Sequence, residues 1–180
     1  MRVIAGRLGG RRLKAPTGTV TRPTSDRVRE ALFSMLGQVE GCHVLDVFAG
    51  SGALGIEALS RGATRAVFIE RNARAVTVLR ANLAALELAD DVAAVRHADA
   101  LAALRGARQR ADTYDLVFID PPYTQAGEWA NELAAILPSL LSPAARVVVE
   151  SATRAPLELP LEIERQRSYG DTSITIHRHQ

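Results

Sequence analysis

The chain has 180 residues, of which 47% are hydrophobic and 23% charged, and its formal net charge is +2. This balance is typical of one globular domain with a sizeable core and excludes general disorder. No apolar run reaches the ~18 residues of a membrane span, and the N-terminus turns basic before a signal-peptide core could form. The single cysteine, Cys42, excludes an internal disulfide and a cysteine-rich metal site and favours a reducing cytoplasm.

The small net charge conceals an asymmetry along the chain. Residues 1–30 contain eight basic and two acidic residues, a balance of +6, so the rest of the chain carries −4. A basic head is typical of proteins that bind polyanions, although a solvated, flexible tail has the same composition. The candidates for nucleic-acid contacts in this segment are Arg7, Arg11, Arg12, Lys14 and Arg22.

The first elements follow from glycines, caps and apolar spacing. Residues 1–22 combine four glycines with short apolar alternations, which predicts a basic N-terminal arm or a small β extension in front of one domain over residues 23–180. Ser25 and Asp26 have the side chains of a helix start. Apolar residues spaced as on one helical face begin at Val28, and they predict a helix that ends near Gly37.

From residue 43 the pattern alternates between strands and helices. Apolar stretches of strand length occur at 43–48, 66–69, 92–96, 116–119 and 146–149, and Ala- and Leu-rich helical stretches lie near 53–60, 72–87, 99–105 and 126–141. This alternation predicts a parallel α/β sheet with helices on both faces. The last extended stretches, 161–167 and 172–178, have only a short turn between them and predict an antiparallel hairpin that closes the sheet.

The turn after the first strand has the composition of a nucleotide-binding loop. Gly50, Gly52 and Gly55 satisfy G-x-G-x-x-G, and Glu70 ends the next strand about 20 residues later. Glycine lets the backbone approach a ligand closely, and an acid at that strand end can accept hydrogen bonds from both ribose hydroxyls. A glycine turn of this spacing can also serve packing alone.

Two further acids bear on the identity of the nucleotide. Asp46 lies four residues before Gly50, where a carboxylate is poorly placed for a pyrophosphate but suits the cationic methionine tail of S-adenosylmethionine. The alternative is that Asp46 caps loop amides. Asp99, after the third strand, could accept a proton from an adenine amino group, but taken alone it is better explained as the N-cap of the helix from Ala100.

The fourth strand ends in Asp120-Pro121-Pro122-Tyr123, the most specific feature of the chain. Two prolines remove two backbone donors, so the loop presents a carboxylate, carbonyl oxygens and an aromatic face. Such acceptors suit a substrate amine: Asp120 and the carbonyl of Pro121 take its hydrogens, and Tyr123 stacks on the base. A bare Asp-Pro-Pro turn could be merely rigid, but its place after a buried strand, at the ligand-binding edge, favours catalysis.

These motifs, in this order, resemble the class I S-adenosylmethionine-dependent methyltransferases that act on base amines. The basic, glycine-containing opening at 2–13, the segment 22–33 and the turn 169–172 narrow the resemblance to the RsmD family, over nearly the whole chain. The resemblance implies a Rossmann-like fold with a seven-stranded sheet and methylation of guanine N2 in bacterial 16S ribosomal RNA. It implies base chemistry at Asp120, Pro121, Pro122 and Tyr123, and S-adenosylmethionine bound by Asp46, Phe48, Gly50, Ser51, Gly52, Glu70, Asp99 and Ala100.

Three other functions are compatible with parts of the sequence. The glycine turn and Glu70 also occur in NAD-dependent oxidoreductases, which leave Asp-Pro-Pro-Tyr without a role. The basic arm alone would suit a non-catalytic RNA-binding module, and the amine chemistry does not distinguish RNA from DNA as the substrate. We expect a cytoplasmic, monomeric enzyme that acts on 16S rRNA or the small ribosomal subunit, without a metal and without a membrane anchor.

Overall fold

The computed structural model describes residues 1–15, 25–121 and 126–180. The helices are α1 (Asp26–Leu36), α2 (Ala53–Ser60), α3 (Ala73–Ala85), α4 (Ala100–Gln109) and α5 (Ala126–Ile136), followed by a short 3₁₀ helix, η2 (Leu137–Leu140). The strands are β1 (His43–Val47), β2 (Arg65–Glu70), β3 (Ala93–His97), β4 (Tyr114–Ile119), β5 (Leu141–Ala152), β6 (Glu162–Tyr169) and β7 (Thr172–Arg178). The predicted alternation of strands and helices is therefore confirmed.

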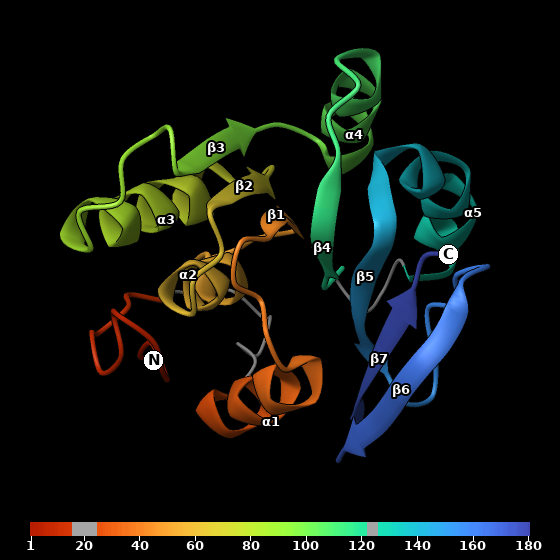
Figure 1. Cartoon of the computed structure of the whole chain (residues 1–180), viewed down its shortest axis with the longest axis horizontal. Coiled ribbons are helices and arrows are strands. Elements are labelled where there is room, and N and C mark those ends of the chain that lie inside the picture. The colour runs from red at the N-terminus through yellow and green to blue at the C-terminus, as the bar shows by residue number, and fades with distance from the viewer. Residues whose placement is uncertain (16–24, 122–125) are drawn as a thin grey trace.

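The strands form one sheet in the order β3-β2-β1-β4-β5-β7-β6 (Figure 1). Strands β1 to β5 run parallel, whereas β7 pairs antiparallel with both β5 and β6. This is the seven-stranded sheet with an antiparallel C-terminal hairpin that the sequence predicted. Parallel strands joined by helices end at one edge of the sheet, where open α/β folds bind ligands.

Helices cover both faces of the sheet and enclose two apolar cores. One core contains residues of α1, α2 and α3 and the β1 and β4 side chains Val44, Leu116 and Phe118. The other contains residues of α4, α5 and η2 and the alternate side chains Leu45, Val47, Val117 and Ile119. This division follows from the two-residue period of strands, which sends neighbouring side chains to opposite faces. Figure 1 shows the two groups of helices on either side of the strands.

The ends of two helices are set by single residues. Ser25 caps α1, its side chain accepting a hydrogen bond from the Val28 amide, and Gly37 follows the helix with φ +67°. The predicted helix over 126–141 was too long, because η2 contains Pro138 and the extended strand β5 already begins at Leu141. Proline lacks the amide hydrogen that a continuing helix needs, so the chain leaves α5 there.

Residues 1–15 form a loop docked on the domain. One isolated bridge, between Arg2 and Arg12, is its β structure, while Val3, Leu8 and Leu13 are buried in the core that α1 and α2 share. Gly6, with φ +81°, lies so close to α2 that a Cβ atom would stand 1.9 Å from the Ser60 carbonyl oxygen. The described part of the arm is therefore held in contact with α2 by apolar burial and close backbone approach.

Candidate active site

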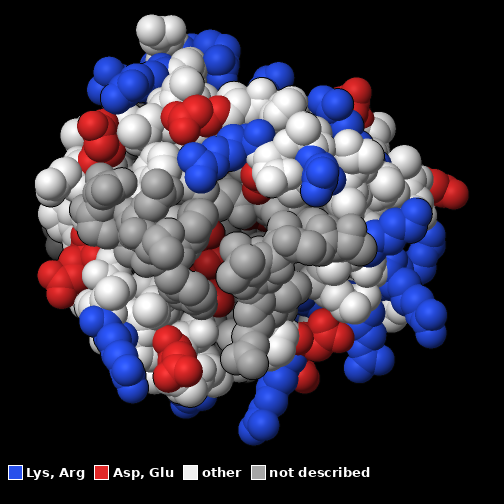
Figure 2. Space-filling model, turned by 180° about the vertical axis from the view of Figure 1, so that it is seen from behind, with Lys and Arg blue, Asp and Glu red and all other residues white. Residues whose placement is uncertain are grey.

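The predicted site residues converge on the carboxyl edge of the sheet. The glycine turn follows β1, Glu70 ends β2, Asp99 follows β3 and Asp120 follows β4. Because these four strands are parallel neighbours, their ends lie side by side. Figure 2 shows a face of the molecule on which some acidic side chains are visible near the centre, and both basic and acidic side chains lie around the outer edge.

The three glycines of the turn have different roles. A Cβ atom on Gly52 would lie 2.3 Å from Cδ1 of Leu79, and one on Gly55 would lie 2.4 Å from Cε1 of Phe68. At these two positions a larger residue would disturb the packing of the helices on the sheet, which is the alternative to ligand binding that the sequence also allowed. Gly50 has φ +55°, and within the described part of the chain no atom lies within 4 Å of the Cβ position. Of the three glycines, Gly50 borders open space that a ligand could fill.

Asp46 is a buried carboxylate behind the turn. It is 2% exposed, and its Oδ2 accepts a hydrogen bond of 2.9 Å from the Gly55 amide, so the capping interaction exists. Removal from water raises the pKa of Asp46 to about 7, the Gly55 amide opposes this rise, and the charge of Glu70 adds to it. No lysine or arginine of the described segments forms an ion pair with Asp46. A cation placed beside this carboxylate would stabilise its charge.

Glu70 bridges the end of β2 to the glycine turn. Its Oε2 accepts a hydrogen bond from the Gly50 amide (2.9 Å), and its Oε1 accepts one from the Asn72 amide (2.7 Å). Each carboxylate oxygen can accept a second hydrogen bond. Glu70 is therefore held in one orientation at the strand end, with acceptor capacity left for hydroxyl groups.

Phe48 and Ser51 shape the turn and do so through different contacts. Phe48 adopts φ +65°, and its ring meets Trp129 edge-on with 4.9 Å between centroids. Ser51 is buried, and its carbonyl accepts a hydrogen bond of 3.0 Å from the side-chain amide of Asn82. That amide also donates to the Lys14 carbonyl (3.0 Å), while the Lys14 amide donates to Asn82 Oδ1 (2.8 Å). One asparagine thus joins the turn to the arm.

Asp99 is the N-cap of α4, which confirms the capping interpretation. Its Oδ1 accepts hydrogen bonds from the amides of Leu101 (3.0 Å) and Ala102 (3.3 Å). Ala100 is 4% exposed and packs in the core below α4. The predicted contact of Asp99 with adenine stays a prediction.

Asp120 stands half-buried at the end of β4, before the buried Pro121. Removal from water raises its pKa well above the usual value for aspartate, and the charges of Glu150 and Asp46 raise it further. The predicted Pro122 and Tyr123 lie outside the described residues. Glu150 was not singled out from the sequence, although it directly follows the apolar run 147–149, just as Glu70 follows the apolar run 66–69.

The exposed cations of the arm remain available to a partner. Arg7, Arg11, Arg12 and Lys14 are exposed, and one guanidinium nitrogen of Arg11 donates a 2.6 Å hydrogen bond to the Ala85 carbonyl at the end of α3. The predicted Arg22 lies outside the described residues. These side chains are attached to a docked backbone, so their placement depends on what holds the arm to the domain.

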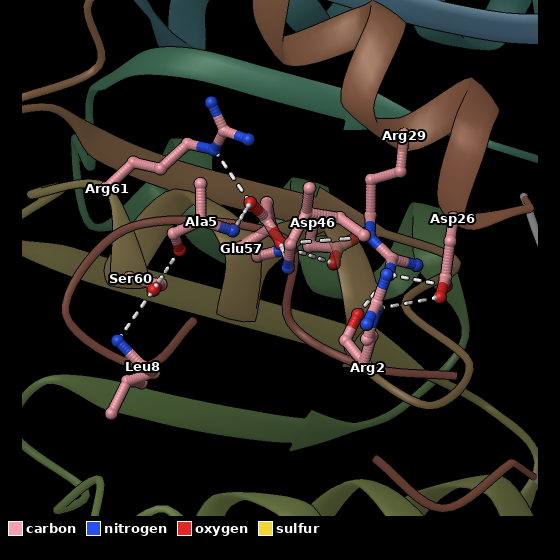
Figure 3. Close-up of polar contacts among 11 residues, drawn as sticks. Arg2, Ala5, Leu8, Asp26, Arg29, Asp46, Glu57, Ser60 and Arg61 are labelled. Atoms are coloured by element: carbon pink, nitrogen blue, oxygen red, sulfur yellow. Dashed lines mark hydrogen bonds and ion pairs between the residues drawn. The ribbon is translucent and has the colours of Figure 1, made fainter. Parts of the chain in front are cut away.

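Glu57 of α2 is the anchor of the arm, and sequence reasoning missed it. Its carboxylate accepts hydrogen bonds from the amides of Ile4 (2.7 Å) and Ala5 (3.0 Å) and from Nε of Arg61 (2.7 Å) (Figure 3). One turn further, Ser60 Oγ donates to the Ala5 carbonyl and accepts from the Leu8 amide. A glutamate that is fully buried thus fixes the path of the N-terminal backbone.

Arg29 also belongs to this network, which corrects the interpretation of the basic head. Its side chain is fully buried and forms ion pairs with Asp26 (3.0 Å) and Glu57 (3.8 Å). It also donates a hydrogen bond to the Arg2 carbonyl. Arg29 was counted among the eight basic residues of the head, but buried in this way it cannot contact a polyanion.

Residues 1–15, 25–121 and 126–180 contain neither a metal-binding cluster nor a membrane-spanning helix. No group of three or more His, Cys, Asp and Glu side chains there could hold a metal ion. None of the helices described is both long and apolar enough to cross a bilayer.

The sequence pattern of one family, described as "Conserved hypothetical protein 95", matches residues 1–178. The chain belongs to this family. It is 39% identical to the "Putative rRNA methyltransferase YlbH" of Bacillus subtilis, with 99% of this chain and 98% of the relative covered. It is 36% identical to the "Ribosomal RNA small subunit methyltransferase D" of Haemophilus influenzae, with coverages of 99% and 94%. The resemblance to the RsmD family is therefore confirmed.

Solved structures give the same fold. The putative methyltransferase yhhF from Escherichia coli superposes with a TM-score of 0.85 at 34% identity, covering 100% of this chain and 98% of that one. An RNA methyltransferase from Salinibacter ruber, solved with S-adenosyl-L-homocysteine, has a TM-score of 0.67 at 21% identity, with 87% and 93% covered. The fold is that of the class I S-adenosylmethionine-dependent methyltransferases.

Proposed function

We propose that this protein transfers a methyl group from S-adenosylmethionine to the N2 amine of a guanine in 16S ribosomal RNA. The observation that carries the proposal is the position of Asp120 and Pro121. Both residues follow β4 and bring acceptor oxygens to the same sheet edge as Asp46, Gly50 and Glu70. The relatives named as methyltransferases of small-subunit ribosomal RNA support the choice of RNA over DNA.

The residues at the edge suit S-adenosylmethionine better than a dinucleotide. Asp46 is buried beside the turn and has no cationic partner among the described residues, so the ammonium group of a methionine tail would compensate its charge. A pyrophosphate near the same carboxylate would be repelled. Glu70 is placed for the ribose hydroxyls, and the space beside Gly50 admits the ligand. S-adenosylmethionine would supply an electrophilic methyl group.

The chain's own contribution to the reaction is to orient the amine. A base amine is a poor nucleophile because its lone pair is delocalised into the ring. The Asp120 carboxylate and the Pro121 carbonyl accept its two hydrogens and so direct the nitrogen lone pair toward the methyl carbon. Asp120 is placed to take the proton that the nitrogen loses, and the raised pKa of this residue favours that transfer. Alignment of the reacting atoms supplies most of the rate gain.

We also propose that residues 1–22 form an arm that grips RNA in front of the methyltransferase domain at 23–180. The exposed arm cations Arg7, Arg11, Arg12 and Lys14 support this, as does the link from Lys14 through Asn82 to the glycine turn. We propose that the enzyme acts in the cytoplasm, where ribosomal RNA is found, and as a monomer. Ile163 is the one large apolar side chain that is exposed among the described residues. A described surface with so little exposed apolar area supports the monomer.

The test is methyl transfer from labelled S-adenosylmethionine to three substrates in parallel: naked 16S RNA, 30S particles and duplex DNA. Nucleoside mass spectrometry should then find N2-methylguanosine in RNA and no methylated base in DNA. Asp120→Ala should lower the rate by at least about 100-fold, because the amine is no longer aligned. Calorimetry should show that its affinity for S-adenosylmethionine stays within a few-fold of wild type.

Asp112→Ala is the matched control, since Asp112 lies before β4 and pairs with Arg110 at the surface. It should leave the rate unchanged. A fully active Asp120→Ala variant would refute the catalytic role. Tight binding of NAD with none of S-adenosylmethionine would refute the reaction itself.

A further inference from the structure

Glu150 is a second buried acid beside the proposed catalytic carboxylate. In the β4–β5 pairing Ile119 stands opposite Val149, so Asp120, directly after β4, and Glu150, within β5, lie at the same level. On its other side Glu150 is paired with Ile174 of β7. Strands on both sides therefore fix its backbone, and neighbouring strands lie only about 4.8 Å apart.

The two carboxyl groups also share one face of the sheet. Phe118 and Val148 point into the core shared with α1 and α2, and the two-residue strand period sends Asp120 and Glu150 to the same side. The charge of Glu150 acts on Asp120 strongly enough to raise its pKa. Glu150 is 6% exposed, so its carboxylate has little contact with water.

The Watson–Crick edge of guanine matches this pair of acceptors. Guanine is the base in RNA that presents a ring N–H directly beside an exocyclic amine, because adenine and cytosine have a ring-nitrogen lone pair at that place. If Asp120 and Pro121 hold the N2 amine, the neighbouring ring N1–H falls beside the next acceptor along the sheet edge. A carboxylate there attracts N1–H and repels a lone pair.

We infer that Glu150 accepts a hydrogen bond from N1–H of the target base and is a residue by which the enzyme selects guanine. This rests on the proposed function, because the target amine must be held at Asp120. It assigns different tasks to the two acids: Asp120 orients the reacting amine, and Glu150 reads the atom next to it. A carboxylate retained only for folding would make no distinction between bases.

The experiment compares two RNA substrates that differ at the target position, one with guanine and one with 2-aminopurine. 2-Aminopurine keeps the 2-amino group but has a lone pair at N1. Values of kcat/KM are measured for wild type, Glu150→Gln and Glu150→Leu, since the ratio between enzymes cancels the intrinsic reactivity of each base. Glu150→Leu should lose about tenfold or more on guanine and change little on 2-aminopurine. Glu150→Gln keeps an acceptor oxygen, so its kcat/KM on guanine should lie between the values for wild type and Glu150→Leu.

Thermal unfolding and S-adenosylmethionine affinity identify variants that are folded, and Glu162→Gln on the exposed strand β6 is the matched control. The inference is overturned if each Glu150 variant lowers kcat/KM for both substrates by the same factor, because that outcome indicates a role in folding or in setting the pKa of Asp120. If wild type methylates neither RNA, the proposed function fails instead.

Discussion

The molecule contains two polar clusters around acidic side chains, and the surroundings of these acids are opposite. At the arm, Glu57 receives two backbone amides and the side chains of Arg61 and Arg29. At the sheet edge, removal from water raises the pKa values of Asp46 and Asp120, and the charges of Glu150 and Asp46 raise that of Asp120 further. No arginine or lysine of the described residues forms an ion pair with either aspartate.

The difference teaches how to separate structural from functional acids in one fold. A buried carboxylate that collects amides and guanidinium groups has its charge compensated by the chain itself. Asp46 and Asp120 have no ion-pair partner among the described residues, so a ligand can compensate their charges, and groups with perturbed pKa values cluster at functional sites. Here the complementary charges would be the ammonium group of the cofactor and the N–H donors of the base.

The largest expected effect on stability is the loss of the paired acid. Glu57→Ala removes the acceptor of two arm amides and leaves Arg29 buried, with Asp26 as its remaining ion-pair partner among the described residues. Breaking a buried ion pair on one side costs about 3–5 kcal/mol, so urea unfolding should show a loss of that order. Glu132→Ala, which removes an exposed ion pair with Arg105, should cost about 1 kcal/mol or less. Equal losses in the two variants would remove Glu57 from its role as the anchor.

The uncompensated cluster predicts a change of the opposite sign. Folding raises the pKa of Asp46 from 3.8 to about 7, so between these values the folded protein holds a proton that the unfolded chain has released. The free energy of unfolding therefore falls as the pH rises through this window. Asp46→Asn lacks this contribution and should be the more stable protein at pH 8 without cofactor, by at most about 4 kcal/mol. The two proteins should converge toward pH 4.

Denaturant unfolding at pH 4, 6 and 8 measures this difference, and Asp112→Asn serves as the control at a partly exposed aspartate. The same Asp46→Asn variant should bind S-adenosylmethionine more weakly, because it has lost the charge facing the ammonium group. A variant that is less stable than wild type at every pH would mean that Asp46 is a structural cap and nothing more.

The two clusters were not equally predictable from sequence. Asp46 and Asp120 were found because each stands at a fixed place relative to a strand and a glycine or proline turn, and turn residues are local signals. Glu57 and Arg29 were missed because their roles depend on contacts between distant positions, such as Glu57 with Ile4, which are 53 residues apart. An arginine in a basic segment gives no local sign that it will be buried.

The same contrast explains the errors in the elements. Six strands were predicted to within two residues at each end because continuous apolar runs mark buried strands, whereas β5 extends beyond the predicted 146–149 at both ends. The helix predicted over 126–141 ended early at Pro138, a local signal that was available in the sequence. Glu150 was also available, as an acid directly after a buried run, but its proximity to Asp120 depends on the β4–β5 register, which no local pattern gives.

A smaller effect is expected from the acid at the end of β2. Glu70→Ala should weaken S-adenosylmethionine binding by about 10- to 100-fold, which corresponds to the loss of hydrogen bonds to a charged group. Part of the loss comes from the Gly50 and Asn72 amides that Glu70 now holds. Glu70→Gln keeps one acceptor oxygen and should lose less. Calorimetry measures both, and an unchanged affinity in Glu70→Ala would remove this residue from the cofactor site.

The smallest expected effect concerns the exposed cations that the anchored arm carries. Replacing Arg11, Arg12 and Lys14 together by Gln keeps the side chains polar and removes three charges. If each contacts a phosphate, the slope of log affinity for 16S RNA against log salt should become shallower by about 2, since a single-stranded contact contributes about 0.7. Stability should be nearly unchanged, because all three side chains are exposed.

The matched control removes the same charge from the C-terminal hairpin, by replacing Arg165, Arg167 and Arg178, which are also exposed. A non-specific effect of net charge would lower both slopes equally, whereas an RNA-gripping arm lowers only the first. Glu57→Ala is the decisive third variant, because it releases the backbone of the N-terminal arm but keeps all three cations. If the cations act from a fixed position, that variant weakens RNA binding although it keeps every cation of the arm. If it binds RNA as wild type does, the docking of the arm serves stability alone.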